Sequence, residues 1–304
     1  MGNDQARKPN NKRFTCRNGN KGKGSIESSS TPKIKKSDSG GQASNVPRNY
    51  FIRDADSPYK YSINVFGRQK YVIVRQNSAE DTWPGGALWD VGVLLANVFC
   101  AAKLSPIHSN RWTRMKVLEL GAGVGLTGIV TGVLGAQQVL VTDLPVVVER
   151  ITKPNVELNG EHYRSVVKRA ESLRVKAQTL RWGNTEDEQQ AILYFAGAFP
   201  DLIIAGDVSY QHKPGAPSHF DDLVQTVLNL SNQETIFVFG HRVRMEASND
   251  LLTDFQRYFD YVEDPIPAHL IDPSFSSVGK HNITIHVMKR SAKAFAKKQT
   301  LEEN

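Results

Sequence analysis

The sequence predicts an α/β protein built on a mostly parallel, doubly wound sheet of seven strands. Strand-like runs alternate with helical patterns along most of the chain, which is the order that parallel strands with crossover helices require. One apolar strand, residues 116–120, runs straight into the glycine-rich turn of residues 121–125 and then into a helix. The last two strands follow each other without a clear helix between them, so we expect an antiparallel, hairpin-like pair at the end of the sheet.

The first 48 residues differ in composition from the rest of the chain. They are rich in Asn, Lys, Gly and Ser, and they hold the excess positive charge of a chain whose formal net charge is +7 over 304 residues. Such a segment buries too little apolar surface to fold alone. We therefore predict a disordered basic tail over residues 1–48, one folded domain over residues 49–290 and a C-terminal tail over residues 291–304.

Composition also limits where in the cell the protein is expected and which kinds of site it can hold. No apolar run approaches the roughly 20 residues of a membrane span, and the N-terminus lacks the apolar centre of a signal peptide, so we expect a cytoplasmic protein. The stretch 33–36 (Lys-Ile-Lys-Lys) leaves nuclear entry or nonspecific RNA contact as alternatives, and Gly2 leaves N-myristoylation as a weaker one. Cys16 and Cys100 stand far apart, and His212, His241 and His281 show no ligand spacing, so we expect no disulfide and no metal site.

An extension precedes the main sheet. Residues 59–76 alternate apolar and polar side chains around Gly67-Arg68-Gln69, which predicts a β-hairpin. Residues 86–100 carry apolar side chains at helical spacing, namely Leu88, Val91, Leu94, Leu95 and Val98, which predicts a helix.

The main elements follow in order. We expect strands at residues 116–120, 138–142, 177–182, 201–205, 235–239, 258–262 and 282–288. We expect helices at residues 126–134, 146–159, 220–230 and 248–259. The acidic run 186–188 is interpreted as a solvated loop or a helix start, and Arg242 and Arg244 as a solvated loop, with contact to an acidic substrate as the alternative.

The glycine turn predicts a ligand that is held through the backbone, at the start of the following helix. Two details argue against a dinucleotide. Leu126 stands where a third glycine is required, and Glu119 places a carboxylate where a pyrophosphate would be repelled. A cationic ligand without phosphate fits better, and S-adenosyl-L-methionine carries both a sulfonium and an ammonium group.

Residues that follow the strands complete the candidate site, because ligands of open α/β sheets bind beyond the carboxyl ends of the strands. Asp143 lies 22 residues beyond Gly121, where a carboxylate accepts hydrogen bonds from ribose hydroxyls; a helix cap is the alternative. Trp182 follows the third strand and could cover adenine; a buried structural Trp is the alternative. The segment Asp207-Val208-Ser209-Tyr210 follows the fourth strand, where a methyl acceptor would enter.

Taken in order, these motifs resemble a known family. They are Gly85-Gly86-Ala87-Leu88-Trp89-Asp90, Glu119 to Gly125, Val141 to Pro145, Asn155-Val156-Glu157-Leu158-Asn159, Leu180 to Gly183, and Asp207 to Tyr210. The set is similar to the methyltransferase-16 family of seven-β-strand protein-lysine methyltransferases, including the methyltransferase-like 21 group, over about residues 50–290. The sequence differs from the family pattern at Arg181, where the family often has an acidic residue, and in segment 161–176, which is long.

The resemblance implies a class I, Rossmann-like fold that uses S-adenosyl-L-methionine, with an N-terminal β-hairpin extension. It implies a cofactor pocket lined by Trp89, Glu119, Gly121, Gly123, Asp143, Trp182 and Ala205. It also implies that Asp207 and Tyr210 face the acceptor amine as catalytic residues, with orienting roles.

The expected activity is methyl transfer to a lysine ε-amine of a protein substrate. Transfer to a protein histidine, an RNA base or a small molecule remains open, as does an inactive module that binds the cofactor and serves as an interaction platform, because a fold alone does not decide a substrate. Residues 49–304 carry a slight negative excess of charge, which argues against nucleic acid as the partner. We expect a monomer that does not bind a membrane.

Overall fold

The computed structural model describes residues 15–17, 58–65, 67–77, 79, 82, 84–101, 112–166, 173–209, 219–242, 246–272 and 283–291. Tyr210, His212, Arg244 and His281 lie outside these ranges, as do nearly all of the two predicted tails. Among the helices in the described ranges, none is both long enough and apolar enough to cross a membrane.

The predicted sheet is confirmed. Its hydrogen-bonded order is β10-β11-β8-β7-β4-β5-β6, and β9 pairs with β11. Strands β6, β5, β4, β7 and β8 are parallel, and β11 is antiparallel to both β8 and β9, as expected for the closing pair. The strands are β4 (Lys116–Leu120), β5 (Gln138–Asp143), β6 (Val175–Thr179), β7 (Leu202–Gly206), β8 (Ile236–Arg242), β9 (Phe259–Tyr261), β10 (Ile266–Pro267) and β11 (Ile283–Arg290).

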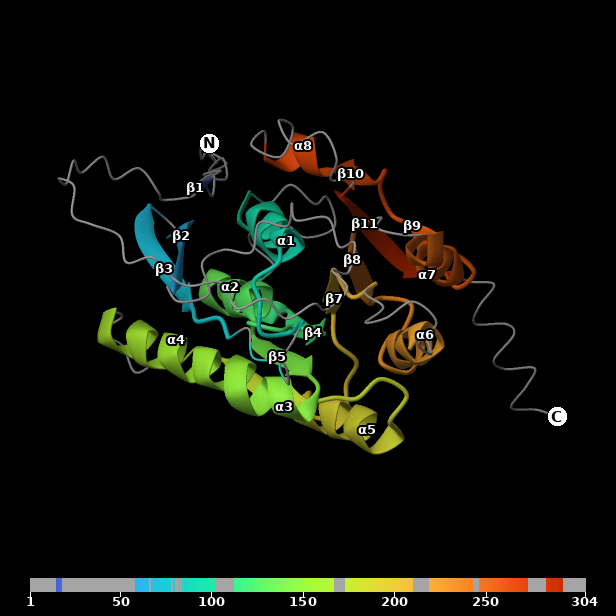
Figure 1. Ribbon diagram of the computed structural model, residues 1–304, viewed down its shortest axis with the longest axis horizontal. Coiled ribbons are helices and arrows are strands. Elements are labelled where there is room, and N and C mark those ends of the chain that lie inside the picture. Colours follow the sequence, from blue (N-terminus) through green and yellow to red (C-terminus); the bar gives the residue numbers. More distant parts are fainter. Residues whose placement is uncertain are drawn as a thin grey trace, which may run out of the picture.

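Helices cover both faces of this sheet, as Figure 1 shows. One face packs against α1 (Asp90–Ala101) and α2 (Leu126–Leu134), and the other against α5 (Thr185–Tyr194), α6 (Phe220–Asn229) and α7 (Glu246–Gln256). Because both faces are covered, the central strands are largely apolar: Val117 and Leu118 are each fully buried but belong to the clusters on opposite sides. The two buried clusters therefore fix the register of the central strands.

A continuous helical segment follows β5 and lies along one side of the molecule (Figure 1). It consists of α3 (Pro145–Val147), a π-helical turn η2 (Val148–Thr152) and α4 (Lys153–Val166). Pro145 stands at the first helical position, where its missing N–H costs nothing. The π turn shifts the side chains that follow it relative to a regular helix, and Thr152 and Asn155 are both fully buried.

The predicted hairpin is confirmed as β2 (Tyr59–Val65) and β3 (Arg68–Val74), with Gly67 in the left-handed region at the turn. A third strand, β1 (Thr15–Arg17), pairs antiparallel with β2. Three residues within the predicted tail, segment 1–48, thus add to the hairpin through backbone pairing, which the composition of the segment does not encode.

Several boundaries differ from the sequence prediction. For the acidic run 186–188, the interpretation as a helix start is confirmed: it lies in the first turn of α5, which is capped by the Asn184 side chain accepting from the Asp187 N–H at 3.0 Å. Strand β6 ends at Thr179, so Trp182 stands in the turn beyond it. The four-residue helix α8 (Ala268–Ile271) and strand β10 occupy the stretch expected to be irregular. The interpretation of Arg242 as part of a solvated loop was wrong, because β8 continues through it and it is 2 % exposed.

Candidate functional site

The glycine turn between β4 and α2 forms the centre of the candidate site. Gly121, Gly123 and Gly125 have φ angles of 61°, 52° and 76°, in the left-handed region that favours glycine. The Ala122 N–H donates to the Thr142 carbonyl of β5 at 2.9 Å, which holds the turn against the neighbouring strand. The turn is therefore a fixed shape that other residue types would strain.

Three strand ends meet at Gly121. A Cβ atom on this residue would lie 2.7 Å from Val208 Cγ1 and 3.4 Å from Trp182 Cζ2. Val208 directly follows Asp207 at the end of β7, and Trp182 lies beyond β6. The expected gathering of residues after β4, β6 and β7 is thus present, with Val208 as a contact that the sequence did not single out.

Glu119 lies inside β4 with its side chain on the α2 face. It is 4 % exposed, and one carboxyl oxygen accepts from the Gly128 N–H at 2.8 Å. Burial raises the pKa of this carboxyl to about 8, although the bond from Gly128 pulls the pKa in the opposite direction. Glu119 thus connects the strand to the first turns of α2, directly below the glycine turn.

Asp143 ends β5 beside the same turn. One carboxyl oxygen accepts from the Gly123 N–H at 2.8 Å and the other from the Leu144 N–H at 2.7 Å. Burial raises the pKa of Asp143 to about 6, even though its side chain is only partly covered from solvent. An ionised carboxyl has about four acceptor sites, so Asp143 keeps capacity for two hydroxyl donors.

The segment 84–89, which lies between β3 and α1 and is here called the strap, contacts the glycine turn. A Cβ on Gly123 would lie 2.7 Å from the Gly85 carbonyl oxygen, so the two backbones touch. Trp89, at the end of the strap, donates from its indole N–H to the Pro84 carbonyl at 3.1 Å. The contact of Gly85 with Gly123 had no counterpart in the sequence analysis, although the pair Gly85-Gly86 was a visible signal of close backbone approach.

Asp207 and Ala205 lie at the end of β7. Asp207 has a φ of 60°, which is rare for a residue with a side chain, and its N–H donates to the Gly240 carbonyl of β8 at 2.9 Å. Such strain at a strand end is typical of functional sites. The Ala205 side chain is fully buried in the cluster on the α6 face, so only its backbone lies near the edge of the sheet.

The donor set suits a cofactor of the expected kind. Two carboxyl groups, Glu119 and Asp143, flank the turn, and residues 121–125 include no Lys or Arg. Of the two, Asp143, with a pKa of about 6, is the carboxyl that is charged at neutral pH, and it favours a ligand with hydroxyl groups and positive charge over a phosphate. Leu144, which follows Asp143, is 54 % exposed and offers an apolar surface at the same edge.

The other candidates for chemistry occupy structural positions. Arg242 donates to the Asp90 carboxylate at 2.8 Å in a buried ion pair, and Arg181 pairs with Asp187 through two hydrogen bonds of 2.8 and 3.0 Å. His241 is 1 % exposed within β8. Within the described ranges, no three His, Cys, Asp or Glu side chains gather closely enough to hold a metal ion.

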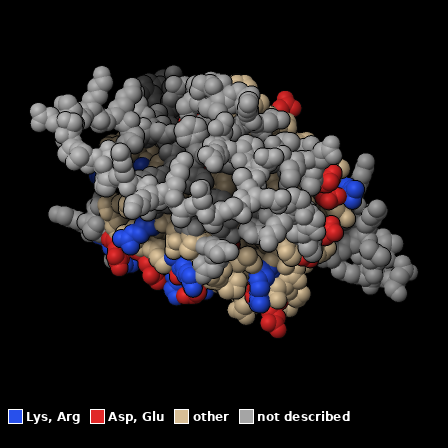
Figure 2. Space-filling view, viewed as in Figure 1, with Lys and Arg blue, Asp and Glu red and all other residues tan. Residues whose placement is uncertain are grey.

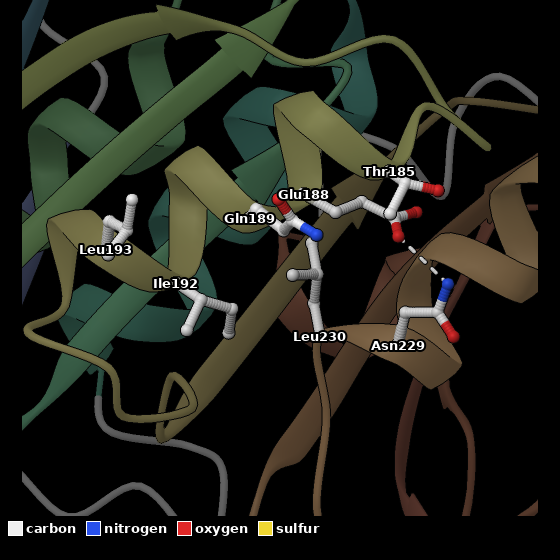
Figure 3. A pocket seen from close by; sticks show the side chains of 7 residues that line it. All are labelled: Thr185, Glu188, Gln189, Ile192, Leu193, Asn229 and Leu230. Atoms are coloured by element: carbon white, nitrogen blue, oxygen red, sulfur yellow. Dashed lines mark hydrogen bonds between the residues drawn. The ribbon is translucent and has the colours of Figure 1, made fainter.

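A separate hollow of about 500 Å³ lies between α5 and α6 and is shown in Figure 3. Its lining residues are Thr185, Glu188, Gln189, Ile192, Leu193, Asn229 and Leu230. Glu188 accepts from Asn229 at 2.9 Å and from Thr226 at 2.7 Å, so its buried carboxyl is engaged in joining the two helices. None of the candidate site residues lines this hollow.

Comparison with known proteins agrees with this geometry. A family profile described as "Lysine methyltransferase" matches residues 68–258, from β3 to the end of α7. The chain is 35 % identical to protein N-lysine methyltransferase METTL21A of Mus musculus over 145 residues, which is 47 % of this chain and 56 % of that protein.

Two further relatives carry the same name. METTL21A of Danio rerio is 31 % identical over 176 residues, covering 58 % of this chain and 69 % of that protein. METTL21A of Xenopus tropicalis is 32 % identical over 146 residues, covering 47 % and 56 %. The chain thus spans between about half and two thirds of the length of the curated relatives it matches.

Proposed function

The chain belongs to the lysine methyltransferase family, and from this premise we propose that it transfers a methyl group from S-adenosyl-L-methionine to the ε-amine of a lysine in another protein. The Rossmann-like methyltransferase fold that the resemblance implied is confirmed, both by the family match and by the strand order. The observation that carries the proposal is the meeting of the glycine turn with Trp182 and with Val208, the residue next to Asp207.

The residues around the turn support specific roles in holding the cofactor. Asp143 accepts from the Gly123 N–H, and we propose that it also accepts from ribose hydroxyls, with Leu144 and Trp182 as apolar surfaces for the adenine. Trp89 approaches from the strap. In this proposal Glu119 contributes by fixing the start of α2 beneath the turn, and at neutral pH its raised pKa leaves it largely protonated.

When bound, S-adenosyl-L-methionine supplies a methyl group on a sulfonium, which an uncharged amine displaces in line to leave S-adenosylhomocysteine. A free lysine with a pKa of about 10.4 is uncharged only about once in 2500 molecules at pH 7. The site must therefore orient the amine and accept the loss of its proton to solvent. We propose Asp207 for the first task, since a carboxylate orients an ammonium or amine through a charge-assisted hydrogen bond.

We propose a protein rather than a nucleic acid as the substrate. On the described surface in Figure 2, Lys and Arg side chains lie interspersed with Asp and Glu, rather than in a patch of one sign. Tyr210 is proposed as an aromatic wall for the acceptor, by the resemblance alone. We further propose a monomer that acts in the cytoplasm, and the basic stretch 33–36 leaves entry to the nucleus open.

A transfer assay tests the proposal. The purified protein is incubated with a cell extract and S-adenosyl-L-methionine that carries a labelled methyl group, and the label is located by mass spectrometry. We expect label on lysine ε-amines of one or a few proteins. Label on RNA or on histidine would show that lysine is not the acceptor. Binding of NAD without binding of S-adenosyl-L-methionine would contradict the proposed cofactor.

A further inference from the structure

Helix α4 pairs with the outer edge of β3 through two asparagine side chains. Asn155 accepts from the Arg75 N–H at 2.8 Å and donates to the Arg75 carbonyl at 3.0 Å. Asn159 makes the same pair of bonds with the backbone of Ile73, at 2.9 and 2.7 Å. The side-chain amides thus replace a neighbouring strand along this edge.

The spacing explains why this works. Four residues of α-helix rise about 6 Å, and two residues of a strand span about 6.6 Å, so amides at positions i and i+4 meet backbone groups at j and j−2. Both side chains are buried, at 1 % and 2 % exposure. Each also makes a third bond: Asn159 donates to the Asn155 carbonyl at 2.7 Å, and Asn155 donates to the Val124 carbonyl at 3.0 Å.

The bond to Val124 distinguishes the two asparagines, because Val124 belongs to the glycine turn. One helical turn earlier, the Thr152 hydroxyl donates to the Gly123 carbonyl at 2.7 Å. The helical segment therefore holds two consecutive carbonyls of the turn, and among its described residues Asn155 alone hydrogen-bonds both to the turn and to Arg75, the residue directly after β3. Asn159 contacts β3 but makes no hydrogen bond to the turn within the described part of the chain.

The two residues after the backbone that Asn155 fixes are bonded to the strap. After Arg75, the Gln76 side chain accepts from the Leu88 N–H at 2.8 Å, and the Asn77 N–H donates to the Gly86 carbonyl at 2.9 Å. The strap then returns to the turn at the contact of Gly85 with Gly123. Asn155 thus holds, on one amide group, the glycine turn and the residue that precedes the two residues bonded to the strap.

We propose that Asn155 is a positioning residue that sets the strap against the glycine turn, and so sets the affinity for S-adenosyl-L-methionine. This rests on the proposed function for the identity of the cofactor. Asn155 acts through the backbones of Arg75 and Val124. Misplacement of a supporting contact by a fraction of an ångström is enough to weaken a bound ligand.

Asn155→Ala and Asn159→Ala form a matched pair of variants. Each removes three hydrogen bonds of a buried amide, so both should lose similar unfolding free energy. Calorimetry well below the unfolding temperature should show that Asn155→Ala weakens binding of S-adenosyl-L-methionine about 10-fold or more, whereas Asn159→Ala stays within about 2-fold of wild type.

Hydrogen exchange in the cofactor-free protein gives a second readout. The Gly86 N–H donates to the Thr82 carbonyl at 2.8 Å, and the Leu88 N–H is protected by Gln76. We expect exchange across residues 84–89 to be about 10-fold faster in Asn155→Ala than in Asn159→Ala. If Asn155→Ala does not fold, Asn155→Asp replaces it, with Asn159→Asp as its matched control, because the isosteric side chain keeps the acceptor for the Arg75 N–H and loses the donors to the Arg75 and Val124 carbonyls.

The outcomes separate this inference from the proposed function. Failure of the wild-type protein to bind S-adenosyl-L-methionine would overturn both. If the wild type binds and the two alanine variants lose affinity and protection equally, Asn155 has only the stabilising role of Asn159, and the inference is wrong while the proposed function stands. Wild-type affinity and exchange in Asn155→Ala would overturn it in the same way.

Discussion

Arg242, the last residue of β8, donates to the carboxylate of Asp90, the first residue of α1, at 2.8 Å, and their side chains are 3 % and 6 % exposed. The two residues are 152 positions apart in the sequence. Asp90 directly follows Trp89, and Arg242 lies two residues beyond Gly240, whose carbonyl accepts from the Asp207 N–H. The ion pair therefore connects the end of the strap to β8, the strand that is hydrogen-bonded to Asp207.

Asp90→Ala should lower the free energy of unfolding by about 3 to 5 kcal/mol, because it leaves the charge of Arg242 buried without this partner. The double variant Asp90→Leu/Arg242→Met should be less destabilised than Asp90→Ala, since it buries no charge. Glu149→Ala, which breaks the exposed pair with Lys153, is the control and should cost less than about 1 kcal/mol. Urea unfolding measures all three, and a cost for Asp90→Ala no larger than that of the control would contradict the prediction.

The contribution of Glu119 to the stability of the cofactor-free protein should fall as the pH rises from about 5 to 8. The folded-state pKa of Glu119 is about 8 against an ordinary value of 4.5, so between these values the folded state keeps a proton that the unfolded chain has lost. This contribution is fully present below pH 4.5 and is lost as the pH rises through 8. Asp143, with a pKa of about 6, adds in the same direction over a lower range, and its partial exposure makes it the smaller contributor.

Glu119→Gln tests the assignment, because glutamine mimics the protonated acid and keeps an acceptor for Gly128. Urea unfolding at pH 5, 6, 7 and 8 should show a clearly flatter pH dependence in the variant. Equal slopes in the two proteins would mean that Glu119 ionises normally in the folded state.

Asp207→Asn should lower the rate of methyl transfer on the order of 10²-fold or more, with little change in cofactor affinity, since the charge is proposed to orient the acceptor amine. Asparagine is chosen over alanine because it tolerates the φ of 60° at this position. Single-turnover transfer at saturating cofactor is the measurement, and Asp260→Asn, an exposed carboxylate on β9, is the control. A wild-type rate in Asp207→Asn would remove this residue from the mechanism.

Deletion of residues 1–13 should leave the unfolding midpoint unchanged, whereas deletion of residues 1–48 should cost on the order of 1 to 2 kcal/mol. The longer deletion removes β1, whose residues Thr15 to Arg17 pair with Ser62 to Asn64 of β2. If the whole of segment 1–48 were disordered, as its composition predicts, neither deletion would lower stability. Thermal unfolding of the two shortened proteins decides between these expectations, with cofactor affinity expected to stay constant in both.

Local patterns in the sequence were sufficient to predict most elements, and the reason is that they depend on near neighbours. Strand β4 and helix α2 have the predicted bounds, because an apolar run, a glycine turn and a helical period are all encoded within about 20 residues. Helix α5 carried a signal, Asn184 before an acidic first turn, but its polar surface masked the helical period. The extension of β8 through Arg242 had no local signal in the sequence, because burial of a charged residue depends on a partner that is distant in the sequence.

The candidate site divides in the same way. The sequence by itself determined which segments end at the carboxyl edge of the sheet, and so it identified Gly121, Asp143, Trp182 and Asp207, since parallel strands must bring their ends together. Only the tertiary structure decided which side chains hold those segments in place. The bonds from Asn155 to Arg75 and from Arg242 to Asp90 join residues 80 and 152 positions apart, and they form only after the packing of both sheet faces has fixed the distances between them.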